Sequence, residues 1–347
     1  MIFYKNYDDF KEKKISRRFI TQSDIIPLIK KLKKNNIFEI NKLGCSIDGK
    51  DINLIKIGTG KTSVLLWSQM HGNETTGTAA IFDIFNYFTN NKYRQDYELI
   101  LNKCTLYFIP MLNPDGAKKC RRTNAIGIDL NRDAVNLTSP ESRILINLRD
   151  KVNADFALNL HDQEIYYSAG NNPKPALMSF LAPSYNEQKE INSLRKKSMQ
   201  LINVINKCLQ KYIPEQVGRY SDKFISSAFG DNIQKRNTST ILIETGGNIK
   251  DKEKQFARKL TSTAIFSALK SIASCSYKLE NINDYKKIPL NVKNKFFDII
   301  IRGVKIKRNN QIFKTDIGIR KNEFEGKGEY KITQTGDLSD YYDFNNI

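Results

Sequence analysis

The chain has 347 residues, of which 40% are hydrophobic and 27% charged, a composition typical of a globular protein with a large core. No window reaches the roughly 18 consecutive apolar residues of a membrane span, and the N-terminal stretch lacks the apolar segment and cleavage site of a signal peptide. Five cysteines without a CxxC pair disfavour a disulfide framework and a thiolate zinc cluster, so we expect a cytoplasmic protein.

The formal net charge of +19 is compatible with a nucleic-acid or anionic-surface partner. The lysines are spread along the chain, however, and the short run KKLKK at 30–34 falls within an amphipathic helix pattern. No recognised nucleic-acid signature accompanies them. We therefore interpret the charge as a bias of composition toward Lys, Ile and Asn, and we expect no nucleic-acid partner.

The first 60 residues predict a helical segment followed by a hairpin. Residues 1–40 are basic, with helical apolar spacing at Ile25, Ile26, Ile29 and Leu32. Residues 43–58 predict a β-hairpin that turns at Asp48-Gly49, a favoured hairpin dipeptide.

The remainder of the pattern alternates strands with helices. In chain order it predicts a strand at 62–68, a helix at 78–88, a strand at 104–110, a turn at 111–116, a polar connection at 117–139, a helix at 140–152, a strand at 154–160, a helix at 186–212, a strand at 239–244 and a helix at 251–271.

This alternation predicts an α/β fold: a mixed, mostly parallel central sheet with helices on both faces. From about residue 285 the sequence pattern changes to an alternation of apolar and polar residues around an Asn309-Asn310 turn. We expect three regions: an N-terminal helical segment over 1–40 packed on a catalytic domain over 41–279, and a small β-rich C-terminal region over 280–347.

The candidate chemistry lies where predicted strands end. The chain has only two histidines, His71 in QMHGNETTG after the strand at 62–68, and His161 after ADFALNL. Glu74 lies three residues beyond His71. Two histidines and a carboxylate form a zinc site that leaves a fourth position open for water. On spacing alone, a metal site and ordinary loop or core histidines remain equally open.

Five motifs occur in a fixed order: HGNE, NPDG, RRTNAIGIDLNRD, LNLHD and ILIETGG. In this order they resemble the zinc carboxypeptidase family typified by carboxypeptidase A, over about residues 44–271. The most specific element is DLNR with an arginine nine residues before its asparagine. The resemblance implies a carboxypeptidase-like fold and a zinc metallopeptidase that hydrolyses the C-terminal amide bond of a peptide bearing a free carboxylate.

The resemblance also implies a role for each matching residue. His71, Glu74 and His161 would hold one zinc ion per chain, and Asp129 would hydrogen-bond the first histidine. Glu244 would be the general base that activates a zinc-bound water. The substrate-facing residues would be Arg122 on the scissile carbonyl, Asn131 and Arg132 on the terminal carboxylate, and Tyr220 as the nearest match to the family's mobile tyrosine.

One departure bears on the substrate. The Asn-Arg pair is followed by Asp133-Ala134, where typical members have an asparagine and an aromatic residue. An acid beside a carboxylate-binding arginine is electrostatically unfavourable, unless it pairs with Arg132 or contacts a basic group of the substrate. The departure therefore leaves open substrates other than ordinary peptides, including peptidoglycan stem peptides.

Two other functions remain as alternatives. A zinc-dependent acylamino-acid deacylase, a kind of amidohydrolase, shares HGNE and DLNR but fits NPDG and ILIETGG less well. A non-catalytic binding module on a peptidase scaffold is disfavoured because the ligand set, Arg122 and Glu244 are all present. A serine or cysteine hydrolase would need one of the two histidines as its base.

Overall fold

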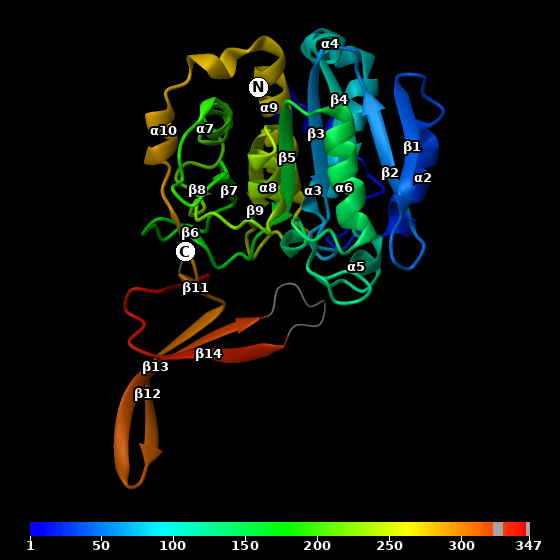
Figure 1. Cartoon of the computed structure of the whole chain (residues 1–347). Helices are drawn as coiled ribbons and strands as arrows, with labels where there is room; N and C mark the ends of the chain where they lie inside the picture. Colours follow the sequence, from blue (N-terminus) through cyan, green and yellow to red (C-terminus); the bar gives the residue numbers. More distant parts are fainter. Residues whose placement is uncertain (322–328, 345–347) are drawn as a thin grey trace.

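The computed structural model describes residues 1–321 and 329–344. It has a main body, in which helices flank a large sheet, and a smaller β-rich region formed by the C-terminal residues (Figure 1). Residues 322–328 and 345–347 of the predicted β-rich region lie outside the described residues. No described helix has the length and apolar character needed to cross a membrane.

The main sheet is mixed, as the sequence predicts. β3 pairs in parallel with β4 and β5, and β5 with β9, whereas β1, β2 and β7 add antiparallel pairings. In spatial order the strands are β1 (Phe38–Cys45), β2 (Asp51–Ile57), β4 (Cys104–Ile109), β3 (Thr62–Ser68), β5 (Phe156–Asp162), β9 (Ser239–Thr245), β7 (Met178–Leu181) and β8 (Val217–Arg219).

Helices cover both faces of this sheet (Figure 1). Successive side chains of β3 enter different cores, because neighbouring residues of a strand point to opposite faces. Val64 and Leu66 belong to the larger core, and Leu65 and Trp67 belong to the smaller one. A strand buried on both faces is apolar at nearly every position, and for this reason the segment TSVLLWS shows little alternation.

The larger core contains side chains of α2, α3, α4, α7 and α9, and the smaller core contains those of α6 and α8. The helices are α1 (Ile2–Lys5), α2 (Gln22–Leu32), α3 (Thr76–Thr89), α4 (Arg94–Lys103), α5 (Pro114–Lys118), α6 (Pro140–Val152), α7 (Ser193–Leu209), α8 (Phe229–Lys235), α9 (Gln255–Ser274) and α10 (Ile282–Lys287), with 3₁₀ turns at Tyr7–Asp9, Asn91–Tyr93, Leu130–Arg132 and Ser276–Leu279.

The N-terminal segment is less helical than predicted. Apart from a 3₁₀ turn, residues 6–21 form no helix. A buried network replaces regular structure there: Arg258 of α9 donates to Asp83 of α3 and to the backbone carbonyl of Glu12, and Tyr7 donates to Asp83 at 2.6 Å. Long-range contacts, invisible to local periodicity, fix this conformation.

The helical spacing places Ile26 on the apolar face of α2, but the residue is 39% exposed. The buried face is instead formed by Ile25, Leu28, Ile29 and Leu32. Residue 26 lies one position beyond Ile25, about 100° around the helix, and so points away from the core.

Several boundaries also differ from the prediction: β1 begins at Phe38 rather than at 43, and α9 spans Gln255–Ser274 rather than 251–271. The segment MLNPDG is not a simple turn, because Pro114 starts α5 and the Asn113 side chain caps it by accepting from the Gly116 amide at 2.8 Å. The helix predicted over 186–212 is α7 alone, which begins after the N-cap Asn192. The sequence patterns did not predict the short elements α4, α8, β6 (Ser168–Ala169), β7 and β8.

The C-terminal region is rich in β-strands, as predicted. It contains β10 (Asn291–Val292), β11 (Phe296–Phe297), β12 (Ile299–Arg308), β13 (Gln311–Lys321), β14 (Tyr330–Gly336) and β15 (Tyr342–Asp343). β12, β13 and β14 form a three-stranded antiparallel sheet, which we call the C-terminal sheet. Asn309 and Asn310, the predicted turn, both have the left-handed φ angles that a two-residue hairpin turn requires.

Candidate active site

The two histidines and Glu74 meet at the carboxyl ends of neighbouring parallel strands. His161 lies within β5, and His71 follows β3 by three residues. The Oε1 atom of Glu74 lies 2.7 Å from Nδ1 of His71, and its Oε2 atom lies 2.8 Å from Nδ1 of His161. All three side chains are buried. The carboxylate thus faces the same ring nitrogen of both histidines.

The loop that carries His71 and Glu74 depends on close backbone contacts. A Cβ atom at Gly72 would come within 2.0 Å of the Gly116 backbone in α5, so only glycine fits there. The buried side chain of Gln69 donates to the Gly72 carbonyl at 2.9 Å, and the Glu74 amide donates to the His71 carbonyl at 3.1 Å. The HGNE and NPDG motifs therefore pack against each other.

The charged groups of this cluster shift one another's pKa. Burial alone would raise the pKa of Glu74, but the His71 and His161 side chains together hold it well below its usual range. Burial lowers the pKa of His71, but Glu74 and Asp129 together raise it above its ordinary value. A buried carboxylate shared by two imidazoles is the environment of a cation site.

Asp129 and Arg122 form the outer layer of the cluster. Asp129 lies 3.1 Å from Nε2 of His71 and accepts from Nε of Arg122 at 2.9 Å. Burial alone would raise the pKa of Asp129, but His71 and Arg122 together hold it below its ordinary value. The Nη1 atom of Arg122 also lies 3.2 Å from Nδ1 of His71, so the guanidinium borders the ligand cluster directly.

Glu244 lies next to this cluster, because its position in β9 pairs with His161 in β5. Burial raises the pKa of Glu244 to about 7, with His161 opposing and Glu74 adding to the shift. A carboxyl group with a pKa near neutrality can exchange a proton at neutral pH, as a general base requires.

One cavity of about 470 Å³ brings the predicted residues together. Its walls include every predicted ligand and catalytic or substrate-binding residue, namely His71, Glu74, Arg122, Asn131, Arg132, His161, Tyr220 and Glu244. Asp129 is placed behind His71 rather than on the wall. Asn131 also anchors the wall, since its Oδ1 atom accepts from the Phe229 amide of α8 at 2.9 Å.

The cavity also includes residues that the sequence reasoning missed. The buried carboxylate of Asp162 lies 3.7 Å from the Lys254 ammonium. The sequence signal for this residue is its position directly after His161, a predicted ligand. The Tyr167 ring lies against the Tyr220 ring at a tilt, with the ring centroids 5.7 Å apart. Lys293, from the C-terminal region, lines the same cavity. Contacts between distant segments place Tyr167 and Lys293, so no local pattern identifies them.

Asp133 does not face the cavity. Its two carboxylate oxygens accept from the backbone amides of Thr138 and Ser139, each at 2.8 Å, and the residue is buried. These bonds hold the loop before α6 and keep the acid away from Arg132. The departure from the usual asparagine is therefore structural.

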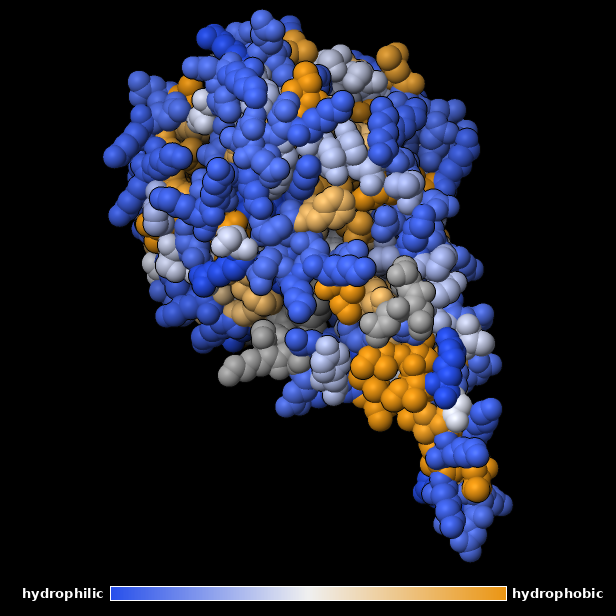
Figure 2. All heavy atoms as spheres, turned by 180° about the vertical axis from the view of Figure 1, so that it is seen from behind, coloured by the Kyte–Doolittle hydropathy of each residue, from blue (hydrophilic) through white to orange (hydrophobic). Residues whose placement is uncertain are grey.

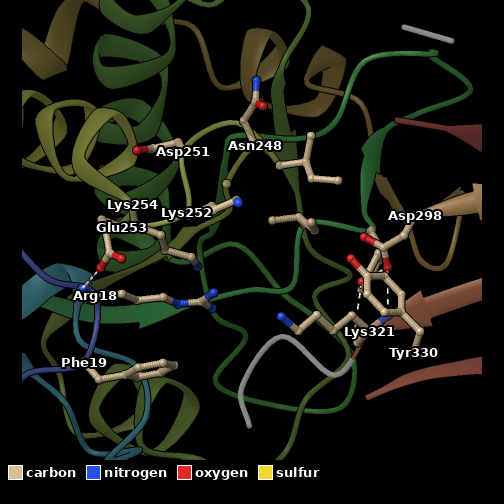
Figure 3. A pocket seen from close by; sticks show the side chains of 14 residues that line it. Arg18, Phe19, Asn248, Asp251, Lys252, Glu253, Lys254, Asp298, Lys321 and Tyr330 are labelled. Carbon is tan, nitrogen blue, oxygen red and sulfur yellow. Dashed lines mark hydrogen bonds between the residues drawn. The ribbon is translucent and has the colours of Figure 1, made fainter. Parts of the chain in front are cut away.

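A second pocket of about 460 Å³ lies where the main body meets the C-terminal sheet (Figure 3). Two of its carboxylates accept from backbone amides: Glu253 accepts from the Arg18 amide at 2.7 Å, and Asp298 accepts from the Lys321 amide at 2.7 Å. It contains neither histidine nor Glu244. The Tyr166 hydroxyl of the main body donates to Asp298 of the C-terminal region at 2.6 Å, so this contact on the pocket wall joins the two parts of the molecule.

The donor set fits zinc. Two imidazoles and one carboxylate, with their ligand atoms within 4.8 Å of one another, form the one cluster of three such donors among residues 1–321 and 329–344. Zinc takes this combination with a further position left open. The Nε2 atom of His161 finds no hydrogen-bond partner in the described part of the chain, unlike that of His71.

Comparisons with known proteins agree with this geometry. The family model for zinc carboxypeptidases matches residues 25–206, more than half of the chain. Carboxypeptidase SOL1 of Arabidopsis thaliana is 24% identical over 216 residues, which are 52% of this chain and 43% of that protein. An uncharacterized protein of Zymomonas mobilis is 30% identical over 128 residues, which are 35% of this chain and 33% of that protein.

The fold also has solved relatives. A metallo-carboxypeptidase from Pseudomonas aeruginosa, solved with (2-guanidinoethylmercapto)succinic acid, aligns with a TM-score of 0.58 and 17% identity over 74% of this chain and 69% of that one. The matched part of the chain spans 33–43% of the two curated relatives, so these matches concern the shared unit. With the family model covering both histidines, Glu74 and the DLNR motif, the chain belongs to the zinc carboxypeptidase family.

Proposed function

We propose that this protein is a zinc-dependent metallocarboxypeptidase that hydrolyses the C-terminal amide bond of a peptide or peptide-like substrate. The observation that carries the proposal is the position of Glu74, 2.7 and 2.8 Å from the Nδ1 atoms of His71 and His161, in a cavity that also contains Glu244. When bound by these three residues, zinc would polarise the scissile carbonyl and lower the pKa of water.

The cationic residues of the cavity suit a carboxylate-bearing substrate. Arg132 and Asn131 would hold the terminal carboxylate, for which a guanidinium can donate two parallel hydrogen bonds. Arg122, 45% exposed and adjacent to the ligand cluster, would donate to the carbonyl oxygen as charge develops there. Asp133 does not oppose these contacts, because its carboxylate is occupied by two backbone amides.

Glu244 would act as the general base and then as the general acid. Its half-buried carboxylate, with a pKa of about 7, would take a proton from the attacking water and deliver it to the departing amine. Burial raises the pKa of Tyr220 well above its ordinary value, so its phenol stays protonated and would serve as a hydrogen-bond donor to the substrate.

The test measures metal content and hydrolysis on the same preparation. We expect one zinc ion per chain and release of C-terminal residues from peptides with free, but not amidated, C-termini. E244Q should retain zinc and lose turnover by about 10²–10⁴-fold. R132Q should raise KM for free-carboxylate peptides more than it lowers kcat.

Two outcomes would favour the alternatives. Cleavage of N-acyl amino acids, with intact peptides left uncut, would identify a deacylase. Zinc binding without hydrolysis in a panel that includes peptidoglycan stem peptides and N-acyl amino acids would leave a binding module. Absence of zinc after reconstitution would refute the metal assignment itself.

A further inference from the structure

A second feature of the molecule lies away from the catalytic cavity, at the far end of the C-terminal sheet. β12 and β13 continue past the rest of the sheet as a two-stranded ribbon that projects from the body (Figure 1). We call residues Val304–Thr315 the distal hairpin. Its strands pair without interruption from Val304 and Thr315 to Arg308 and Gln311, and its Asn-Asn turn has the favoured backbone conformation. The distal hairpin is thus a well-formed element.

The distal hairpin exposes large apolar side chains. Ile306 and Phe313 are paired across the strands and therefore lie on one face, while Ile312 lies on the other. They are 41%, 51% and 67% exposed, in that order. The apolar face continues through Ile301 and Ile332 of the same sheet, and Figure 2 shows hydrophobic residues gathered below the body. Apolar patches of this kind mark sites of interaction.

The same hairpin is strongly cationic. It carries Lys305, Lys307, Arg308 and Lys314 and no acidic residue. Lys305 lies directly opposite Lys314, an arrangement in which like charges destabilise the ribbon. The described residues supply no carboxylate partner for any of the four cations. An external anionic partner would remove the repulsion.

The base of the sheet, in contrast, is fixed to its surroundings. The Arg320 guanidinium lies 4.0 Å from the centre of the Phe297 ring, and Arg302 pairs with Asp316 at 3.2 Å. Tyr166 of the main body donates to Asp298 at 2.6 Å, and both residues line the pocket in Figure 3. The sheet therefore holds the distal hairpin away from the body on a fixed base.

We propose that the distal hairpin docks the protein on an anionic phospholipid bilayer. Lipid headgroups would meet Lys305, Lys307, Arg308 and Lys314, while Ile306, Ile312 and Phe313 would enter the boundary of the acyl chains. A bilayer is the partner that offers an anionic layer directly over an apolar one. A nucleic acid would leave the three apolar side chains in water, and a second copy would bring four more cations against these four.

The experiment uses the full chain and vesicles of phosphatidylcholine, with or without phosphatidylglycerol. Co-sedimentation should show binding to the mixed vesicles only, and the binding should weaken as salt is added. K307Q/R308Q should bind roughly thirtyfold more weakly, and I312S/F313S at least about tenfold more weakly. F313W should show a blue shift of its emission with mixed vesicles, against the constant signal of buried Trp67.

Matched variants control for charge and apolar exposure elsewhere. K33Q/K34Q removes two exposed cations near α2, and L99S/L279S removes two exposed leucines; both should bind vesicles like the wild type. All four double variants should hydrolyse soluble peptides normally, because none of their residues lines the catalytic cavity. The docking proposal and the catalytic proposal can therefore fail separately.

Three results would overturn the docking proposal. The first is no binding of the intact protein to the mixed vesicles. The second is equal weakening by K33Q/K34Q and K307Q/R308Q, which would show a response to net charge alone. The third is dimerisation that I312S/F313S abolishes, without vesicle binding, which would identify a second copy as the occupant of the apolar face.

Discussion

The Oδ1 atom of Asp129 lies 3.1 Å from Nε2 of His71, the ring nitrogen that points away from Glu74. This contact assigns the two nitrogens of the ring different partners, so that Nδ1 is the atom presented to the cavity. A carboxylate behind a histidine ligand fixes both the tautomer and the orientation of the ring. The pair links the DLNR motif to the HGNE motif, although 58 residues separate them.

The first prediction concerns this pair. D129N should weaken zinc binding by about 10–100-fold, because the amide cannot supply the negative charge that favours a proton on Nε2 of His71. Competition with a fluorescent chelator measures the affinity. D133N is the matched control, since Asp133 belongs to the same loop but faces the amides of Thr138 and Ser139. Equal zinc affinities for wild type and D129N would contradict the assigned role.

The second prediction concerns metal removal. A ligand that binds only the folded state stabilises it by about 2.7 kcal/mol at a hundredfold excess over its Kd. Zinc added to the chelator-treated protein should therefore raise the Tm of the wild type and of E244Q. H161A should lose this increase, because it lacks one of the three donors. An undiminished zinc response in H161A would place the metal elsewhere.

The third prediction concerns a buried acid on the cavity wall. Burial raises the pKa of Asp231 to about 7. Between pH 4 and about 7 the unfolded chain has released this proton while the folded protein retains it, so the free energy of unfolding falls as pH rises through this window. D231N lacks this dependence and keeps an acceptor for the Ile225 amide, 3.3 Å away.

D231N should thus be more stable than the wild type by on the order of 1–3 kcal/mol at pH 8, with a smaller difference at pH 4. Urea denaturation across this range gives the two curves. A difference that does not change with pH, or that grows as pH falls, would show that Asp231 is ionised in the folded protein throughout.

The fourth prediction concerns the buried pair between α3 and α9. D83N should destabilise the protein by about 3–5 kcal/mol, because it leaves the Arg258 guanidinium buried without its counter-charge. E98Q breaks an exposed pair with Arg94 and should change stability by less than about 1 kcal/mol. Denaturant titration compares the two. A similar small effect for both variants would mean that residues 6–21 are held by apolar contacts alone.

The fifth prediction concerns Asp133. D133N should leave the ratio of kcat/KM between peptides with basic and neutral C-terminal residues unchanged, because the carboxylate points into the loop before α6. D133A should lower stability by about 1–3 kcal/mol through loss of two hydrogen bonds to backbone amides. Parallel kinetic and denaturation measurements separate these effects. A tenfold change of the ratio in D133N would place Asp133 in contact with substrate.

The sequence alone predicted the features that depend on short stretches of chain. The apolar runs that end in His71, His161 and Glu244 predicted neighbouring strands, and parallel strands bring their carboxyl ends to one edge of a sheet. The hairpin turns at Asp48-Gly49 and Asn309-Asn310 were likewise predictable, because they depend on local backbone preference. These signals were sufficient for the α/β class and for the candidate ligands.

The tertiary structure decided where individual side chains point. The sequence did not show where the Asp133 side chain points. Its two backbone partners lie in a loop, and the path of a loop cannot be predicted from apolar periodicity. Tyr167 and Lys293 join the cavity only because the chain folds back on itself there. Residues 6–21 are mostly not helical, because contacts to α3 and α9 stabilise a different conformation. Local propensity sets which elements can form, whereas contacts between residues far apart in sequence select among them and position the groups that perform the chemistry.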